Sequence, residues 1–332
     1  MGKRYQLSTL VMIIAGIVLL AVPYINDSRS FLILMTQIFI FAVFAMSYDI
    51  LIGFTGIVSF GHAMFFGIGA YATGIILDRF EPTVPTLLVS IAAGILLAAA
   101  VSFIVGLLTL RLKSHYYAML TLAFAGLFLV AAEKWRTLTM GNDGFTFRVP
   151  DILKDRMDYY FICLVVMLIV YFLLKRITQS PFGKVMVAIR ENEQRVESLG
   201  FQVLYYKIIA SVIAGVIASI SGSLYVLSLR FANTSVFSMD TTLDALLMTI
   251  IGGVGTLVGP MLGAGLIEFA HHWLTELAKE HPIFERWLIF FGILYILVVM
   301  FFPAGIIGTI QGWGRKRIIQ RKSVKEQKSA AG

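Results

Sequence analysis

Residues 183–207 read GKVMVAIRENEQRVESLGFQVLYYK, a charged stretch set between two long apolar segments. Its composition favours helix, and Gly200 is a natural place for a helix to stop. The stretch belongs to a polar interruption from 174 to 207, whereas the sequence on either side is apolar enough for a membrane. This alternation predicts a polytopic membrane protein in which the interruption is an ordered, helical loop.

The overall composition agrees with a membrane protein. The chain has 332 residues, of which 58% are hydrophobic and 14% charged, and its mean hydropathy is +0.86. A soluble domain of this size could not bury so much apolar surface, whereas about 20 apolar residues cross a bilayer as a helix. The sequence predicts an all-α protein of about ten transmembrane helices, some short or broken, near residues 7–25, 31–52, 57–77, 84–110, 116–132, 159–174, 208–229, 242–251, 254–277 and 284–302.

The distribution of positive charge predicts the orientation. The net charge is +8, and most of the 27 lysines and arginines fall on one side if both termini and residues 175–207 face the cytosol. The loop 133–158, with the turn-forming run Met-Gly-Asn-Asp-Gly at 140–144, is then external. We expect a membrane domain over 1–310 and a basic cytosolic tail over 311–332. The tail is expected to contact anionic lipid rather than nucleic acid.

Polar side chains inside apolar segments are candidates for a translocation path, because they are costly at membrane depth. Candidates are Asp49, Thr55, Ser59 and His62, and on a helix Ser59 and His62 share a face. Two blander interpretations stay open, namely a hydrated Asp49 at the membrane interface and a His62 that only joins helices. Asp49 and Glu268, each standing alone, could instead bind a proton or cation in an ion-coupled secondary transporter.

Small residues spaced by four predict close helix packing, here at Gly215, Ser219, Gly255, Gly259 and Gly263. The glycines at 252–255 do not form a nucleotide loop, because no strand precedes them and no Lys-Ser/Thr pair follows. Cys163 lies in an apolar run and is expected to be a small buried hydrophobe. The sequence predicts no metal site and no cofactor. An integral enzyme is disfavoured because no span carries paired carboxylates or a nucleophile with its base, and a membrane scaffold is the other non-transport alternative.

The polar interruption has two interpretations. On a continuous helix, Arg190 would pair with Glu193 or Gln194, and the whole would be a solvated loop. A short rigid helix between spans would also serve as a mechanical coupling element. Its candidate residues are Arg190, Glu191, Asn192, Glu193, Gln194, Glu197 and Gly200.

Four stretches together resemble a known family: GFTGIVSFGHAMFFGIGAYATG (53–74), AIRENEQRVESLGFQVLYYKIIA (188–210), IIGGVGTLVGPMLGAGLIE (250–268) and FFPAGIIG (301–308). They are similar to the permease subunits of branched-chain amino-acid ABC importers, and most similar to the M-type subunit of the Liv (leucine-isoleucine-valine) system. The likeness runs from about residue 31 to 308. It departs from the family at Asp49, where other members often have Asn. The coupling pattern Glu-Ala-Ala-x3-Gly aligns with Gln194-Arg195-Val196-x3-Gly200, which keeps only the glycine and the spacing.

The resemblance implies a fold similar to the type II ABC importers and a transporter subunit without catalysis of its own. It implies four kinds of partner: a sister permease that completes a heterodimer, two cytosolic ATPase subunits, an external substrate-binding protein, and the lipid of a bacterial plasma membrane. The substrate implied is a branched-chain or other small amino acid. Relatives that carry urea or short amides leave those solutes as the alternative.

Overall fold

The computed structural model describes residues 28–112, 114–280 and 305–309, with isolated residues 19, 20, 23, 292, 296 and 300. The expected first and last spans and the basic tail therefore lie outside the described residues, apart from isolated positions. The longer helices are α2 (Arg29–Asp49), α3 (Ala63–Arg79), α4 (Val84–Thr109), α5 (Ser114–Lys134), α7 (Arg156–Gln179), α10 (Val203–Leu229), α11 (Met239–Gly252) and α12 (Val258–Glu280). The shorter elements are the π-helical turn η1 (Ile50–Thr55), α6 (Arg136–Thr139), α8 (Pro181–Glu191) and α9 (Glu193–Ser198), three 3₁₀ turns at Gly141–Asp143 (η2), Asp151–Leu153 (η3) and Thr234–Phe237 (η4), and a two-strand pair described below.

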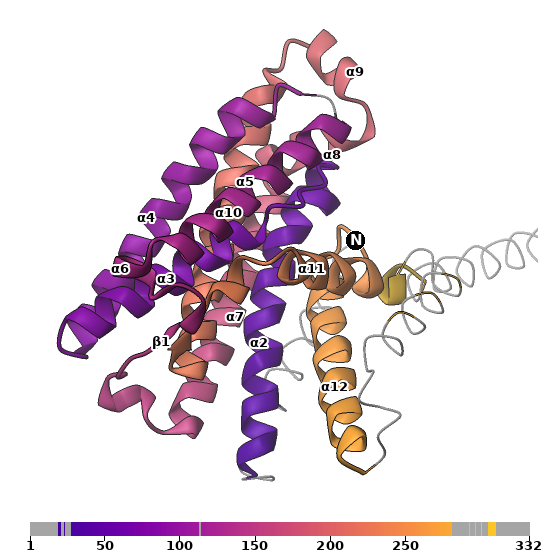
Figure 1. Ribbon diagram of the computed structural model, residues 1–332. Coiled ribbons are helices and arrows are strands. Elements are labelled where there is room, and N and C mark those ends of the chain that lie inside the picture. The colour runs from indigo at the N-terminus through magenta and orange to yellow at the C-terminus, as the bar shows by residue number, and fades with distance from the viewer. Residues whose placement is uncertain are drawn as a thin grey trace, which may run out of the picture.

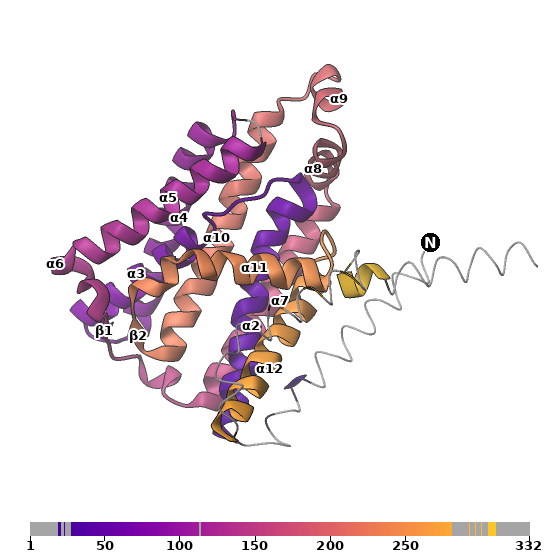
Figure 2. The same ribbon diagram turned by 45° about the vertical axis from the view of Figure 1, so that its right-hand side comes forward.

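Helix α10 is the centre of the bundle and packs against α2, α3 and α4, while α2 also packs against α7, α11 and α12. Most long helices run between two ends of the molecule, one marked by α8 and α9 and the other by β1 (Figures 1 and 2). In both views α11 instead lies across the other helices at about mid-height. The loop from α11 to α12 therefore lies at about this height, beside the end of α2, rather than at either end of the molecule.

Among the described residues, five helical segments are long and apolar enough to cross a membrane: Arg29–Thr55, Val84–Thr109, His115–Lys134, Arg156–Gln179 and Val203–Leu229. Their outward faces are apolar. On α4, for example, Leu88 is 63% exposed and Leu96 is 70% exposed. A belt of exposed leucine, phenylalanine and methionine side chains is unfavourable in water and suited to the hydrocarbon of a bilayer.

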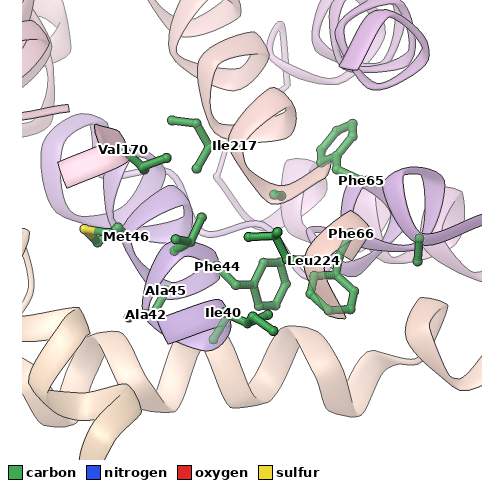
Figure 3. Packing of buried hydrophobic residues seen from close by; sticks show 14 of the residues in the cluster. Ile40, Ala42, Phe44, Ala45, Met46, Phe65, Phe66, Val170, Ile217 and Leu224 are labelled. Carbon is green, nitrogen blue, oxygen red and sulfur yellow. The ribbon is translucent and has the colours of Figure 1, made fainter. Parts of the chain in front are cut away.

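The core is filled by aromatic and aliphatic side chains of α2, α3 and α10. Figure 3 shows Phe44 beside Phe66 and Leu224, and the Phe44 and Phe66 ring centroids lie 4.7 Å apart. Serine hydroxyl groups form hydrogen bonds between neighbouring helices of this core. Ser221 donates a hydrogen bond to the Ile40 carbonyl at 2.7 Å, and the Ser102 and Ser211 hydroxyls lie 3.0 Å apart. Such bonds hold helices together where burial of apolar surface gives little driving force.

Two of the expected spans begin later than predicted. The helix expected from 57 starts at Ala63, because Gly56 ends the π-helical turn in the left-handed conformation (φ +73°) and residues 56–62 are not helical. The helix expected from 254 starts at Val258. Gly255 (φ +78°) therefore lies in the α11–α12 loop, so the predicted stripe of Gly255, Gly259 and Gly263 on one helix is wrong at its first member.

The polar segment 133–158 is ordered and closes the end of the bundle opposite α8 and α9. Strand β1 (Phe145–Thr146) pairs antiparallel with β2 (Phe231–Ala232), a contact too short to show in the sequence pattern. Phe145 is buried and its ring lies 6.0 Å from that of Tyr71 on α3. The Arg230 guanidinium donates to the Lys154 carbonyl at 3.0 Å.

Candidate functional site

The charged part of residues 183–207 folds as two helices, α8 and α9, rather than as one. Asn192 has extended backbone (φ −160°, ψ 97°) and caps α9 by accepting the Arg195 N–H at 2.9 Å. Because the helix breaks at Asn192, Arg190 and Glu193 lose the spacing that would pair them. The predicted pair is wrong: Glu193 lies 2.5 Å from Lys207 at the start of α10, and Arg190 turns the other way, into the bundle.

A polar cavity of about 560 Å³ opens at the α8–α9 end. Its walls come from the end of η1, the α4–α5 connection, the α8–α9 break and the start of α10. The residues that line it include Thr55, Arg111, Tyr117, Arg190, Glu191, Asn192, Glu193, Gln194, Glu197 and Lys207. The structure thus gathers the candidate coupling residues around one cavity, except Gly200, and adds Thr55 from the candidate path.

Gly200 lies just beyond α9 and has φ +86°. Its N–H donates to the Glu197 carbonyl at 2.9 Å, which closes the last turn. A Cβ at this position would have no neighbour within 4 Å. The glycine therefore serves the backbone conformation of the turn and makes no packing contact that a side chain would disturb.

Asp49 is not hydrated at a membrane interface, as its position had suggested. It is fully buried, and both carboxylate oxygens accept backbone hydrogen bonds from the α11–α12 loop. Gly255 N–H lies 2.6 Å from Oδ1, and Leu257 N–H lies 3.1 Å from Oδ2. The carboxylate therefore anchors a loop more than 200 residues away in sequence. Backbone N–H donors of that loop stabilise its charge.

Arg190 reaches the same place from α8. Its Nη1 donates to the Gly53 carbonyl in the π-helical turn η1, and its guanidinium interacts electrostatically with Asp49. Arg190 is exposed as a whole and also lines the cavity. α8, η1 and the α11–α12 loop thus meet at one point.

Ser59 and His62 do not share a helical face, because residues 56–62 are not helical. His62 is fully buried and its Nε2 lies 2.8 Å from Ser47 Oγ, whose hydroxyl donates to the Phe44 carbonyl at 2.6 Å. This assigns the proton to Nε2, and Nδ1 has no hydrogen-bond partner among the described residues. The ring also stacks on Phe44, with centroids 5.4 Å apart.

Ser59 is enclosed in the same way. It is 1% exposed, and its Oγ accepts the Gly61 N–H at 3.3 Å. Tyr48 donates to the Ser59 carbonyl at 2.9 Å. Of the four candidate path residues, only Thr55 lines the cavity, while Asp49, Ser59 and His62 lie in the packed interior of this conformation.

Glu268 does not stand alone. It is 9% exposed on α12 and interacts electrostatically with Asp244 on α11, and Tyr225 interacts with both carboxylates. Asp244 lies on the surface of this chain. Local sequence did not predict this pair, because Asp244 and Glu268 lie on different helices; a carboxylate at Asp244 within the expected span 242–251 was the usable signal.

The small residues predicted to pack between helices do lie at close contacts between helices, except Gly255, which lies in a loop. A Cβ added at Gly263 would collide with the Met248 carbonyl, and one at Gly259 with the Gly253 carbonyl, so α11 and α12 touch through their backbones. On α10, a Cβ at Gly215 would lie 3.1 Å from Ser102 Cβ on α4. The Ser219 backbone lies directly against Gly69 on α3. These contacts leave no room for larger side chains.

Comparison with known proteins places this chain in a family. Residues 30–299 match the family model of the permease component of branched-chain amino acid transport systems. A probable branched-chain amino acid transport permease protein LivM of Methanocaldococcus jannaschii is 26% identical over 313 residues, which cover 81% of this chain and 90% of the relative. The LivM permease of the high-affinity branched-chain amino acid transport system of Salmonella typhimurium is 23% identical and covers 84% of this chain and 70% of the relative. BraD of Pseudomonas aeruginosa, named as a permease of the same kind of system, is 23% identical over 81% of this chain and 91% of its own length. No solved structure matches the chain.

Proposed function

Because the chain belongs to the family of permease components of branched-chain amino acid transport systems, we propose that it is the membrane subunit of an ATP-driven importer. Its solutes are branched-chain or other small amino acids, the solutes named for its relatives. Separate ATPase subunits hydrolyse the ATP, since the sequence contains no Gly-x4-Gly-Lys-Ser/Thr phosphate loop. The chain is a transporter subunit of the bacterial plasma membrane and not an enzyme.

In this proposal the chain has about ten spans in an arrangement like that of type II ABC importers, with both termini in the cytosol. A sister permease completes the translocation path, two ATPase subunits dock at the α8–α9 end, and a loaded binding protein docks at the β1–β2 end. The charge distribution supports this orientation, because residues 175–207 and the C-terminal tail carry much of the positive charge.

One observation carries the coupling role. Arg190, Glu191, Asn192, Glu193, Gln194 and Glu197 line a single cavity with Thr55, at the end of the long helices. A movement imposed on α8 and α9 from outside the membrane would therefore reach the end of η1, which continues α2, directly. Closure of an ATPase dimer on these helices would tip the bundle between its two openings.

The test is reconstitution in liposomes with the ATPase, sister permease and binding protein encoded by neighbouring genes. Leucine uptake is measured with internal ATP, with internal ADP and without the binding protein. We expect uptake only when both ATP and the binding protein are present. ATP hydrolysis that the binding protein stimulates without leucine uptake would keep the importer and move the substrate to another small solute, such as urea or a short amide.

The Asp244–Glu268 pair favours a second function, an ion-coupled secondary transporter, because intramembrane carboxylates commonly mark ion pathways. Uptake measured with and without an ionophore distinguishes the ion-coupled transporter from the ATP-driven importer. Uptake that collapses with the ion gradient while ATP is held constant would support ion coupling and contradict the importer. Uptake that requires ATP and is unchanged by the ionophore would exclude the ion-coupled transporter.

A further inference from the structure

The Arg190 side chain joins two segments that are far apart in sequence. It leaves α8, lies along Gly56 and ends at the Gly53 carbonyl of η1, next to Gly255 of the α11–α12 loop. Its guanidinium is planar and carries five donors, so it can hold a carbonyl and remain beside a carboxylate at the same time. Here the carboxylate is that of Asp49, with which it interacts electrostatically.

Asp49 binds the α11–α12 loop from the end of α2, next to the Arg190 contact. It is the last residue of α2, and its two oxygens bind the N–H groups of Gly255 and Leu257. Leu257 has φ +56°, a conformation that leucine rarely adopts, so the loop backbone is held in place by its surroundings. α2 and the α11–α12 loop are therefore fixed to each other through one carboxylate, and the π-helical turn follows α2 without a break.

Three glycines make room for the two charged side chains. A Cβ at Gly53 would collide with Asp49, and would come within 2.5 Å of the Gly255 nitrogen. A Cβ at Gly56 would lie 2.9 Å from Arg190 Cγ, and one at Gly255 would lie 3.0 Å from Arg190 Nη1. The contact of Arg190 with η1 and the α11–α12 loop thus depends on glycine at three positions around it.

The π-helical turn and the α11–α12 loop, which meet here, both have unusual backbone conformations. A π-helical turn inside a helix is an uncommon local arrangement that is frequent at functional sites. The α11–α12 loop contains Gly253 and Gly255, both with positive φ, and connects the transverse helix α11 to α12. A shift of α8 would act on both elements through the Arg190 side chain.

We propose that Arg190 and Asp49 are the joint that passes movement from α8 to the α11–α12 loop. Both are positioning residues, which act by making the transverse helix α11 follow α8. The inference rests on the proposed function, because it needs α8 to be the element that the ATPase moves.

The experiment uses the full reconstituted complex and compares Arg190→Met, Arg190→Lys, Asp49→Asn and the double variant Arg190→Met/Asp49→Asn. The matched control is Lys184→Met, an exposed cation on the same helix. The readouts are recovery of the assembled complex, ATP hydrolysis stimulated by the binding protein, and leucine taken up per ATP hydrolysed.

For Arg190→Met we expect an assembled complex that hydrolyses ATP while uptake per ATP falls about tenfold, within the range typical of coupling between two sites. Arg190→Lys should recover part of the uptake per ATP, because an ammonium still donates to the Gly53 carbonyl. The Lys184→Met control should match the wild type. A wild-type uptake per ATP in Arg190→Met would overturn the joint, and so would a parallel loss of hydrolysis and uptake, which would make Arg190 a docking contact.

The double variant separates coupling from stability. Removing Arg190 alone leaves a buried carboxylate without its neighbouring positive charge, whereas the double variant removes both charges and retains an oxygen acceptor for the Gly255 N–H. Because Asp49→Asn also places an NH2 group against the Leu257 N–H, we expect the double variant to match Asp49→Asn in stability and Arg190→Met in uptake per ATP. Recovery of uptake per ATP in the double variant would mean that the defect was only an unpaired charge, and would overturn the proposal.

The wild type distinguishes the two levels of failure. If wild-type liposomes show neither ATP-dependent uptake nor ATP hydrolysis stimulated by the binding protein, the proposed function fails and the joint fails with it. If the wild type is coupled and the Arg190 variants are coupled equally well, only the joint is wrong.

Discussion

At the scale of single residues, Asp49 shows how a charge is accommodated in the interior of this bundle. Two backbone N–H groups bind its oxygens at 2.6 and 3.1 Å, and the Arg190 guanidinium adds an electrostatic interaction. Each hydrogen bond to a charged group contributes about 1.5–3 kcal/mol. Without these partners the carboxylate would be a large penalty, so the α11–α12 loop and α2 depend on each other for stability.

Single glycine residues also allow two helices, such as α3 and α10, to approach closely. A Cβ at Gly69 on α3 would collide with the Ser219 carbonyl on α10, whereas a Cβ at Gly126 on α5 has nothing within 4 Å. We predict that Gly69→Ala destabilises the protein by about 1–3 kcal/mol, as overpacking does. Gly126→Ala is the matched control and should be neutral or stabilising by up to about 1 kcal/mol, because alanine favours helix.

Thermal unfolding of the purified protein in detergent measures both changes. Equal midpoints for the two variants would contradict the close contact between α3 and α10. A lower midpoint for Gly69→Ala alone would support it.

At the scale of elements, α8 and α9 are separate because Asn192 caps the second helix instead of continuing the first. The break lets α8 direct Arg190 into the bundle while Glu193 on α9 pairs with Lys207. A continuous helix would have placed Arg190 and Glu193 together on the surface, where an ion pair contributes little. The local break therefore decides which way the charged side chains point.

The turn after α9 gives a prediction at this scale. Gly200 has φ +86° and its N–H donates to the Glu197 carbonyl, whereas proline fixes φ near −65° and has no N–H. We predict that Gly200→Pro abolishes uptake in the reconstituted complex and leaves the solute affinity of the binding protein unchanged. Gly200→Asn is the control, because asparagine tolerates the left-handed conformation.

Uptake and binding-protein affinity are measured side by side. Normal uptake in Gly200→Pro would remove the turn from the coupling element. Loss of uptake in both variants would show that position 200 needs glycine for a reason other than its backbone conformation.

At the scale of the whole molecule, the two ends differ in what they present. The α8–α9 end has the polar cavity, and the opposite end is closed by β1, β2 and the ordered segment 133–158. The long helices between them expose apolar side chains. This division into two polar ends and an apolar belt is what a bilayer requires of the chain.

The orientation of the two ends is tested with a matched pair of serines. Ser198 on α9 and Ser235 in η4 are both exposed, and the single native cysteine, Cys163, is buried. We predict that a membrane-impermeant maleimide labels Ser235→Cys on intact cells and labels Ser198→Cys only after the membrane is opened. The native chain, whose one thiol is enclosed, is the unlabelled control.

The reverse labelling pattern would invert the topology and move the proposed ATPase contact to the other end. Equal labelling of both cysteines on intact cells would contradict a membrane that separates the two ends.

Local sequence determined the class of protein and the approximate position of most described helices. The expected span 84–110 is the helix Val84–Thr109, and 116–132 lies within Ser114–Lys134. Hydropathy and helix propensity are sums over neighbouring residues, so these features follow from the chain without knowledge of its packing. The same sums cannot show that Gly56 ends a π-helical turn, or that α11 lies across the bundle.

Only the tertiary structure decided the partners of the charged residues. Arg190 binds a carbonyl 137 residues away, and Asp49 binds an N–H group 206 residues away. Neither contact leaves a trace in the local pattern, because each depends on where packing of whole helices brings two distant backbones together. The sequence by itself determined a helical membrane protein with a charged loop; packing decided that one arginine of that loop reaches the core.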